Sequence, residues 1–408
     1  LFFTSLTFLI TTGAGLSEKG DPLRLPLIFL LQAGVFLSLT TADFFNLFVA
    51  FGLMLNSSYA LLALESAPEK RLSAFLYVIL NVLGGFLFLS TAALVYGATG
   101  NLNMAALKLF FAALGPSPWI VALGLASITI YGLKAGLFPF YFWLPDSYPI
   151  LPPSLAALFG GVLTKVGIYV LVRMFVTILP PELKALHTLL LALAGLTMLL
   201  GVLGAVSKSS VSKILSYHIL SQVGYMALGL GLFTVPALAA TLYFTVHNIV
   251  VKSSLFLIGG EAARARGSDE LSSMGFLWGT APLLGVFFLL QAFSLAGIPP
   301  LSGFWGKYLL FSETLASEHY LLLLIAVLTS FLTLFSMIKI WSGAFLGERC
   351  GENRPLSANS MGWIAVSISA ALLLGLGAEG VWLFAEHAAS ELFDPAHYVE
   401  ALLPGGGS

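Results

Sequence analysis

The chain has 408 residues, of which 58% are hydrophobic and only 9% are charged, and its formal net charge at pH 7 is -1. So few charges exclude a water-soluble domain, in which about a quarter of the residues are charged. The near-zero net charge, without a run of Lys and Arg, excludes a nucleic-acid-binding surface, and the single cysteine, Cys350, excludes an internal disulfide or a multi-thiolate metal site.

Apolar stretches recur along the whole sequence, and each is long enough to cross a hydrocarbon core of about 30 Å as a helix. Because the first residue, Leu1, lies inside such a stretch, without Met or a signal-peptide pattern, we expect further helices upstream. Twelve spans are predicted from breaks at Pro, Gly and charged residues. They cover residues 2–14, 26–41, 44–64, 72–96, 118–140, 155–179, 185–206, 210–232, 236–259, 275–316, 321–346 and 360–387.

The first interruption inside a predicted span follows Lys134, where Gly136, Pro139 and Pro145 lie close together. Glycine loosens a helix and proline removes a backbone donor, so we expect the helix to break at this point.

A second interruption lies within the tenth predicted span, 275–316, which is too long for one straight crossing. Pro299 and Pro300 interrupt it, and they mark either a break within one span or a turn between two. A turn would place Arg349 and Arg354 on the opposite side from most other loop cations, against the positive-inside rule. We therefore predict one broken span, with residue 1 outside the cell and the loops rich in Lys and Arg in the cytoplasm.

Two broken spans in comparable positions indicate inverted repeats with an ion site at each break. The predicted repeats are residues 26–179 and 180–346, with five spans each. An N-terminal helix and loop (1–25), a C-terminal helix (347–387) and a surface segment with a frayed tail (388–408) complete the predicted organisation.

Four lysines lie inside apolar stretches with no charged neighbour in the sequence, namely Lys134, Lys165, Lys252 and Lys307. A charge at mid-membrane costs about 2.5–3.5 kcal/mol even on the lenient insertion scale, so these amines need a bundle interior or a wet cavity. Since desolvation makes a buried amine release its proton more readily, each can hold a proton reversibly. The alternative is snorkelling, in which the ammonium extends to the headgroups; this is our interpretation of Lys339.

Two histidines supply further titratable groups, and an unperturbed pKa of about 6.5 suits a proton relay. His247 precedes Lys252 by five residues, about 140° around a helix, so the two need not share a face. His218 lies in a polar run, 216–222, of an otherwise apolar helix. The alternative for both histidines is a hydrogen bond between helices.

Carboxylates are scarce within the predicted spans. Asp43 and Asp146 are interpreted as helix caps or loop organisers, and Glu261 as a terminal charge. The sequence contains no paired His/Cys spacing, Walker loop or Gly-x-Ser-x-Gly elbow, so we expect no metal, no cofactor and no enzymatic activity of the chain itself.

Several segments together resemble the antiporter-like membrane subunits shared by Mrp-type multisubunit Na⁺/H⁺ antiporters and respiratory complex I. They are Lys134 followed by AGLFPFYFWLPDSYP, Lys165 in GGVLTKVGIYVLVR, then KILSYHILSQVGYMALGLG, HNIVVKSSLFLIGG and LAGIPPLSGFWGKYLLF. The resemblance covers nearly the whole chain. TADFFNLFVAF and ELFDPAHYVEALL are most similar to the MrpD branch of the family.

The resemblance implies an all-α fold of fourteen helices, the first two missing here, with two inverted five-helix repeats that each contain a broken helix. It places Lys134 and Lys307 on the two broken helices and Lys165 on a connecting helix, with His247 and Lys252 along the central polar axis. With His218, these residues form the predicted proton relay. The implied partners are other membrane subunits, protons, Na⁺ and the lipid of the cytoplasmic membrane.

One position departs from the family pattern. Members usually have a glutamate after the Phe-Val-x-Phe stretch, paired with the first lysine, but this sequence has Gly52 there. Asp43, some 13 Å away along a helix, or a residue of a partner chain could substitute, or this half could transport differently.

Three functions are consistent with these observations. The first is a subunit of a cation/proton antiporter that exchanges protons against Na⁺. The second is a proton-pumping subunit of a redox-driven complex, such as a membrane-bound hydrogenase or an NADH or ferredoxin-quinone oxidoreductase. The third is a scaffold that lost transport with Gly52.

Overall fold

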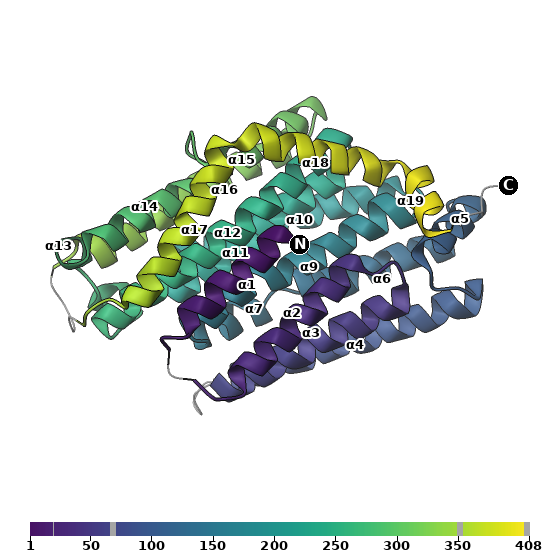
Figure 1. Cartoon of the computed structure of the whole chain (residues 1–408). Helices are drawn as coiled ribbons and strands as arrows, with labels where there is room; N and C mark the ends of the chain where they lie inside the picture. The colour runs from purple at the N-terminus through teal and green to yellow at the C-terminus, as the bar shows by residue number, and fades with distance from the viewer. Residues whose placement is uncertain (19, 66–70, 349–353, 404–408) are drawn as a thin grey trace.

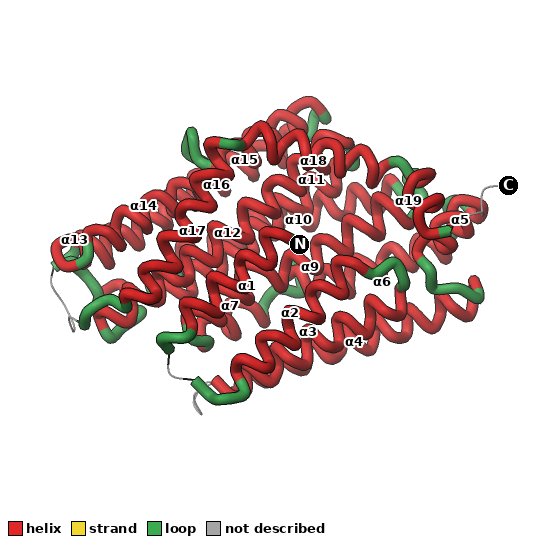
Figure 2. Tube along the Cα trace, viewed as in Figure 1, coloured by secondary structure: helices red, strands yellow, loops and turns green. Residues whose placement is uncertain are grey.

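The computed structural model describes residues 1–18, 20–65, 71–348 and 354–403. Every regular element in these ranges is a helix, as predicted (Figure 2). Eight helical segments are long and apolar enough to cross a membrane. They are Phe44–Glu65, Leu72–Thr99, Pro118–Ala135, Pro153–Ile178, Lys184–Ser207, Val235–Arg266, Tyr320–Leu346 and Ala358–Leu376.

Within the first part of the chain, α2, α3 and α4 pack in that order at one edge of the molecule, with α4 outermost, whereas α1 lies nearer the middle (Figure 1). Asn103 begins the short helix α5, which was not predicted from the sequence, because its Oδ1 accepts hydrogen bonds from the N–H groups of Ala105 and Ala106. The elements are α1 (Phe2–Gly15), α2 (Arg24–Thr40), α3 (Phe44–Glu65), α4 (Arg71–Thr99), α5 (Met104–Leu114) and α6 (Pro118–Ala135).

The first predicted break is confirmed. Helix α6 ends at Ala135, and Gly136 adopts a left-handed conformation with φ of 82°, which glycine accommodates without strain. Three segments of π-helix are present in the described chain, and two of them belong to the span after this break. The elements after the break are α7 (Trp143–Ser147), a 3₁₀ turn (Tyr148–Ile150), α8 (Pro153–Leu158), a π-helix (Phe159–Leu163), α9 (Thr164–Val172) and a π-helix (Arg173–Ile178).

The second predicted break is also confirmed, because α14 ends at Ala296 and α15 begins at Ser302. Gly297 has φ of 90°, like Gly136 at the first break. The 32-residue helix α12 contacts α8, α11, α14, α15, α17 and α18, so it lies at the centre of the bundle. The elements are α10 (Lys184–Ser207), α11 (Val211–Leu232), α12 (Val235–Arg266), a 3₁₀ turn (Leu271–Ser273), α13 (Leu277–Thr280), α14 (Pro282–Ala296), α15 (Ser302–Ala316), α16 (Tyr320–Ile340) and a π-helix (Trp341–Leu346).

The predicted single helix 360–387 is wrong. The chain forms α17 (Ala358–Leu376), α18 (Ala378–Phe393) and α19 (Pro395–Leu402), with a bend at Gly377. The end of α17 is held against the second break, since Trp305 Nε1 donates to the Gly375 carbonyl at 3.2 Å. Helix α18 then packs on α12, and α17 packs on α1 (Figure 1).

Matching features occur in the two parts of the chain. Backbone bridges join Asp43 to Asn103 just before α3 and after α4, and Ser210 to Glu270 just before α11 and after α12. A π-helix ends the last span of each part, at 173–178 and 341–346. The boundaries of the two repeats, 26–179 and 180–346, stay a prediction.

Candidate functional site

The first buried lysine, Lys134, lies in the last turn of α6, one residue before the helix ends. Its side chain is only 4% exposed. The ammonium donates to two oxygens of one residue on α4, the Asn81 carbonyl at 2.9 Å and the Asn81 Oδ1 at 3.2 Å. No carboxylate among the described residues forms an ion pair with it.

A cavity of about 200 Å³ lies between α3 and α4 and reaches Lys134. Gly52 lines this cavity, and a Cβ added there would meet nothing within 4 Å. Asp43 does not substitute for the missing carboxylate, because its Oδ1 accepts from the Asn46 N–H at 2.8 Å at the start of α3. The interpretation of Asp43 as a cap is therefore confirmed.

Lys165 follows the π-helix 159–163 and is 3% exposed. Its ammonium donates to the Gly160 carbonyl at 2.6 Å. A π-helix shifts the backbone hydrogen-bond register and is frequent at functional sites. Lys165 also lines a hollow of about 1230 Å³, together with Leu1 and Phe2.

Lys307 lies on α15, after the second break, and is 2% exposed. Its ammonium reaches back to the end of α14, where it donates to the carbonyls of Leu295 at 2.9 Å and Ala296 at 3.1 Å. The last carbonyls of a helix lack partners within the helix and carry its negative dipole end, which attracts a cation. Ser330 Oγ lies 3.1 Å from the ammonium, and the Tyr225 ring centroid lies 5.0 Å away.

His247 connects α12 to both sides of the second break. Its Nδ1 lies 2.8 Å from Ser302 Oγ, and Ser302 Oγ lies 3.1 Å from Ser294 Oγ. Ser294 belongs to α14 and Ser302 to α15. The Nε2 atom of His247 is buried and has no hydrogen-bond partner in the described structure, so this nitrogen is available to a water or a proton carrier.

The remaining two predicted relay residues are Lys252 and His218. Lys252 is fully buried, and within the described part of the chain its ammonium has one acceptor, the Leu215 carbonyl on α11, at 3.3 Å. His218 Nε2 lies 2.5 Å from Ser336 Oγ on α16, so the histidine joins two helices. Both interpretations of His218, a hydrogen bond between helices and a titratable group, are compatible with this contact.

Five of the six predicted relay residues form an electrostatically connected group. Lys252 interacts with Lys165 and Lys307, and His247 interacts with all three lysines. His218 interacts with Lys252 and Lys307. We call these five residues the central cluster. Lys134 is separate, because no charged side chain of the described part of the chain interacts appreciably with it.

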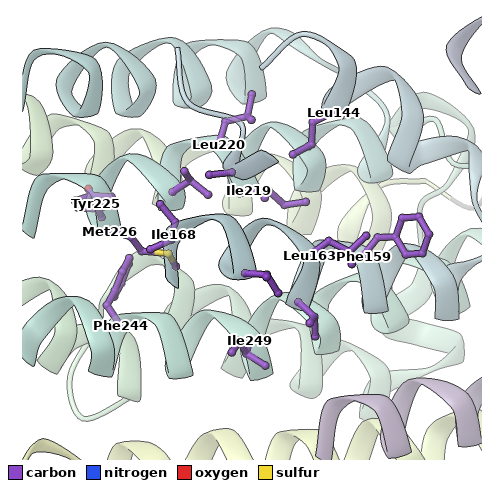
Figure 3. Packing of buried hydrophobic residues seen from close by; sticks show 14 of the residues in the cluster. Leu144, Phe159, Leu163, Ile168, Ile219, Leu220, Tyr225, Met226, Phe244 and Ile249 are labelled. Carbon is purple, nitrogen blue, oxygen red and sulfur yellow. The ribbon is translucent and has the colours of Figure 1, made fainter. Parts of the chain in front are cut away.

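Buried apolar side chains pack between the helices that carry the central cluster, together with buried polar ones such as Ser221, Asn248 and Ser253. Figure 3 shows Ile168 from α9, Met226 from α11, and Phe244 and Ile249 from α12 packed in the space between these helices. In a buried interior, a charge without a partner is costly, and each of the four predicted relay lysines donates to a carbonyl oxygen.

The snorkelling alternative is wrong for the four buried lysines, since none is more than 4% exposed. Lys339, interpreted from the sequence as a snorkelling lysine, also binds acceptors within the protein. Its ammonium donates to the carbonyls of Val206 and Lys208 at 3.0 and 2.6 Å, where α10 ends. It therefore caps a helix.

The other predicted surface acids have local contacts. Glu261 forms an ion pair with Arg264 at 2.7 Å and accepts from the Ser357 N–H at 3.2 Å. It thus fastens the end of α12 to the start of α17. Asp146 is exposed in the short helix α7.

Sequence reasoning missed the hydrogen-bond partners of the relay residues. Asn81 could have been found as a lone amide in the apolar stretch 72–96, and Ser302 by its place between Pro300 and Gly303. The π-helix beside Lys165 has only the pair Gly160–Gly161 as a signal.

Comparisons with known proteins agree with this geometry. The family model described as "NADH:quinone oxidoreductase/Mrp antiporter, TM" matches residues 41–333. This match covers most of the chain, including both breaks and all six relay residues. The chain belongs to this family.

Two curated members of the family are bacterial antiporter subunits. The chain is 42% identical to the Na⁺/H⁺ antiporter D subunit of Alkalihalophilus pseudofirmus, over 95% of this chain and 79% of that protein. It is 36% identical to the protein of the same name from Bacillus subtilis, over 91% of this chain and 76% of that protein.

Comparison with solved structures shows that the fold is shared as well. A chain of the Mrp complex from Dietzia sp. DQ12-45-1b is 31% identical and superposes with a TM-score of 0.92, covering 98% of this chain and 84% of that chain. A chain of respiratory complex I from Thermus thermophilus is 26% identical, with a TM-score of 0.77 over 93% of this chain and 85% of that chain. This member of the family is therefore a multi-pass membrane protein and a transporter subunit, and its relatives work within multisubunit membrane complexes.

Proposed function

We propose that the chain carries protons and exchanges them for Na⁺ as a D-type subunit of a multisubunit antiporter in the cytoplasmic membrane. The predicted orientation places residue 1 outside the cell. The higher identity to antiporter subunits, 42% against 26% for the complex I chain, favours this function over a redox-driven complex.

The observation that carries the proposal is the central cluster. Five titratable side chains from α9, α11, α12 and α15 are buried in the bundle and interact electrostatically. Binding a proton at one member changes the proton affinity of the others. A buried group of this kind can pass protons when water enters between its members.

The second break supplies Lys307 with neutral acceptors. Its ammonium is held by two carbonyls of a helix end, Leu295 and Ala296, rather than by a carboxylate, and the Ala296 carbonyl also accepts from Ser330 Oγ. Loss of the proton from Lys307 removes its attraction to these carbonyls. The amine can then turn toward another member of the cluster, so charge and position are coupled at this site.

The two predicted repeats, 26–179 and 180–346, fit an exchange of two ions along separate routes. The matched bridges and π-helices of the two parts support this division. The first repeat would use Lys134 and the second Lys307, with Lys165 and Lys252 between them.

The experiment compares Lys307→Ala with Lys339→Ala in complexes reconstituted in vesicles. Lys307→Ala is expected to abolish proton movement while the complex still assembles. Lys339→Ala, which removes a lysine that caps α10 outside the cluster, is the control and should transport normally. Wild-type flux in Lys307→Ala would remove the second break from the mechanism.

A parallel variant tests the scaffold alternative. Lys134→Ala should also reduce ion flux in assembled complexes. Unchanged flux in this variant would mean that the first half of the chain is a scaffold.

A further inference from the structure

A crevice runs between α3 and α4 at the outer edge of the molecule, where Figure 1 shows these helices with α4 outermost. Gly52 on α3 and Gly85 on α4 both line it, and a Cβ at either position would meet nothing within 4 Å. The crevice therefore has room for a side chain from outside. Its inner end is Lys134.

The contacts of Lys134 leave its charge uncompensated. An ammonium has three donors, and its two acceptors within the described chain are both neutral oxygens of Asn81. Burying an ammonium without a counter-charge costs several kcal/mol. The charge therefore favours an anion at the inner end of the crevice.

A polar side chain lies at the mouth of the same crevice. Asn56, one helical turn after Gly52, lines the crevice and is exposed on the outer face of α3. No described residue hydrogen-bonds to its side chain, although it lies well inside a helix that crosses the membrane. A polar side chain on a membrane-facing surface is typical of a contact between helices, as are small residues that allow close approach.

We propose that a transmembrane helix of a neighbouring subunit packs over the α3–α4 crevice, bonds to Asn56 and presents a carboxylate to Lys134. A lipid chain would leave the Asn56 side chain without a hydrogen-bond partner and the ammonium without a counter-charge, and water alone would leave the charge uncompensated. The carboxylate side chain enters through the space over Gly52. Only the transport assay that tests this inference rests on the proposed function; the cross-linking experiment does not.

The first experiment uses the assembled complex. In a Cys350→Ser background, Asn56→Cys is coupled to a thiol-reactive benzophenone, irradiated in native membranes, and the cross-linked peptide is identified by mass spectrometry. The expected product contains a transmembrane helix of another subunit with Asp or Glu within about one turn of the cross-link. Cross-linking to lipid alone, or to a helix without a carboxylate there, overturns the proposal.

A matched control is Gly362→Cys on α17, where a Cβ also has open space but which lies outside the crevice. Its cross-links should not include the same peptide. This readout does not measure transport, so the docking inference can fail while the proposed function stands.

The second experiment moves the carboxylate into this chain. Changing the partner's identified acid to its amide should cause loss of ion flux, and Gly52→Glu in this chain should restore it from the opposite wall of the crevice. Gly362→Glu should not restore flux. Undiminished flux in the amide variant, or failure of Gly52→Glu to restore it in an assembled complex, contradicts a shared carboxylate at Lys134.

Discussion

Lys134 and Lys307 lie beside corresponding breaks, yet their surroundings differ. Lys307 binds two carbonyls of the broken helix and a hydroxyl and belongs to the central cluster. Lys134 binds only Asn81, has no charged neighbour among the described residues, and faces a cavity at the molecular edge. The second half thus holds its cation with its own backbone, whereas the first half depends on a single amide and on what covers the crevice.

The largest expected effect is at Lys252, the member of the central cluster that interacts with both Lys165 and Lys307. Lys252→Leu removes the fully buried amine that interacts with Lys165 and Lys307. Since a positioned proton-transfer group contributes about a hundredfold or more, proton flux in reconstituted vesicles should fall on the order of a hundredfold.

Assembly should be normal in this variant, because leucine fills a similar space. Subunit composition after purification checks this point. A flux within twofold of wild type would show that Lys165 and Lys307 do not communicate through Lys252.

The next effect concerns the side-chain acceptor of Lys134. Asn81→Leu removes the Oδ1 acceptor and leaves only the Asn81 backbone carbonyl, and a hydrogen bond to a charged group contributes about 1.5–3 kcal/mol. The thermal midpoint of the complex should fall and flux should decrease. Asn81→Asp, which supplies a charge-assisted partner, should retain or raise the midpoint.

The control for this prediction is Thr91→Val on the same helix, because Thr91 is only partly buried and bonds to the Leu87 carbonyl of its own helix. It should leave the midpoint unchanged. If Asn81→Leu is as stable as Thr91→Val, the Asn81 Oδ1 contributes nothing to holding Lys134, and the backbone carbonyl or a partner in the complex is sufficient.

A smaller effect is expected at the junction of α12 with the second break. Ser302→Ala removes the hydroxyl that lies 2.8 Å from His247 Nδ1, at a cost of about 1 kcal/mol for a net hydrogen bond. Flux should fall several-fold and its pH profile should shift, since His247 loses the partner that fixes its tautomer. Ser302→Thr keeps the hydroxyl and should transport normally; equal loss in both variants would indicate a packing defect instead.

The broken helices could be predicted from sequence because proline and glycine act locally on the backbone. The burial of the lysines could be predicted as well, since an isolated charge in an apolar stretch has few alternatives. The missing carboxylate at Gly52 was visible only as a departure from a family pattern.

The partners of the lysines could not be predicted. Asn81 and Leu215 are far from Lys134 and Lys252 in sequence and meet them only through helix packing. The bend at Gly377 was missed for the same reason, because the contact of Trp305 with Gly375 that holds α17 is a tertiary contact.

The smallest expected effect distinguishes the loops that carry the two backbone bridges. In the first half, the loop uses neutral Asn101 and Asn103, whereas in the second half Asp269 bonds to Ser210 and Ser212 outside the membrane spans. Burial raises the pKa of Asp269 above its usual value near 3.8, against the lowering effect of these hydrogen bonds.

Because the folded protein binds this proton more tightly than the unfolded chain, the contribution to stability is complete below the usual pKa and is lost as the pH rises through the raised one. Asp269→Asn, which cannot ionise and still accepts from the Ser212 N–H, should remove this pH dependence. Thermal midpoints of the complex measured from pH 4 upward should therefore decline less in Asp269→Asn than in wild type. Parallel curves would show that Asp269 is ionised throughout and that its hydrogen bonds outweigh its burial.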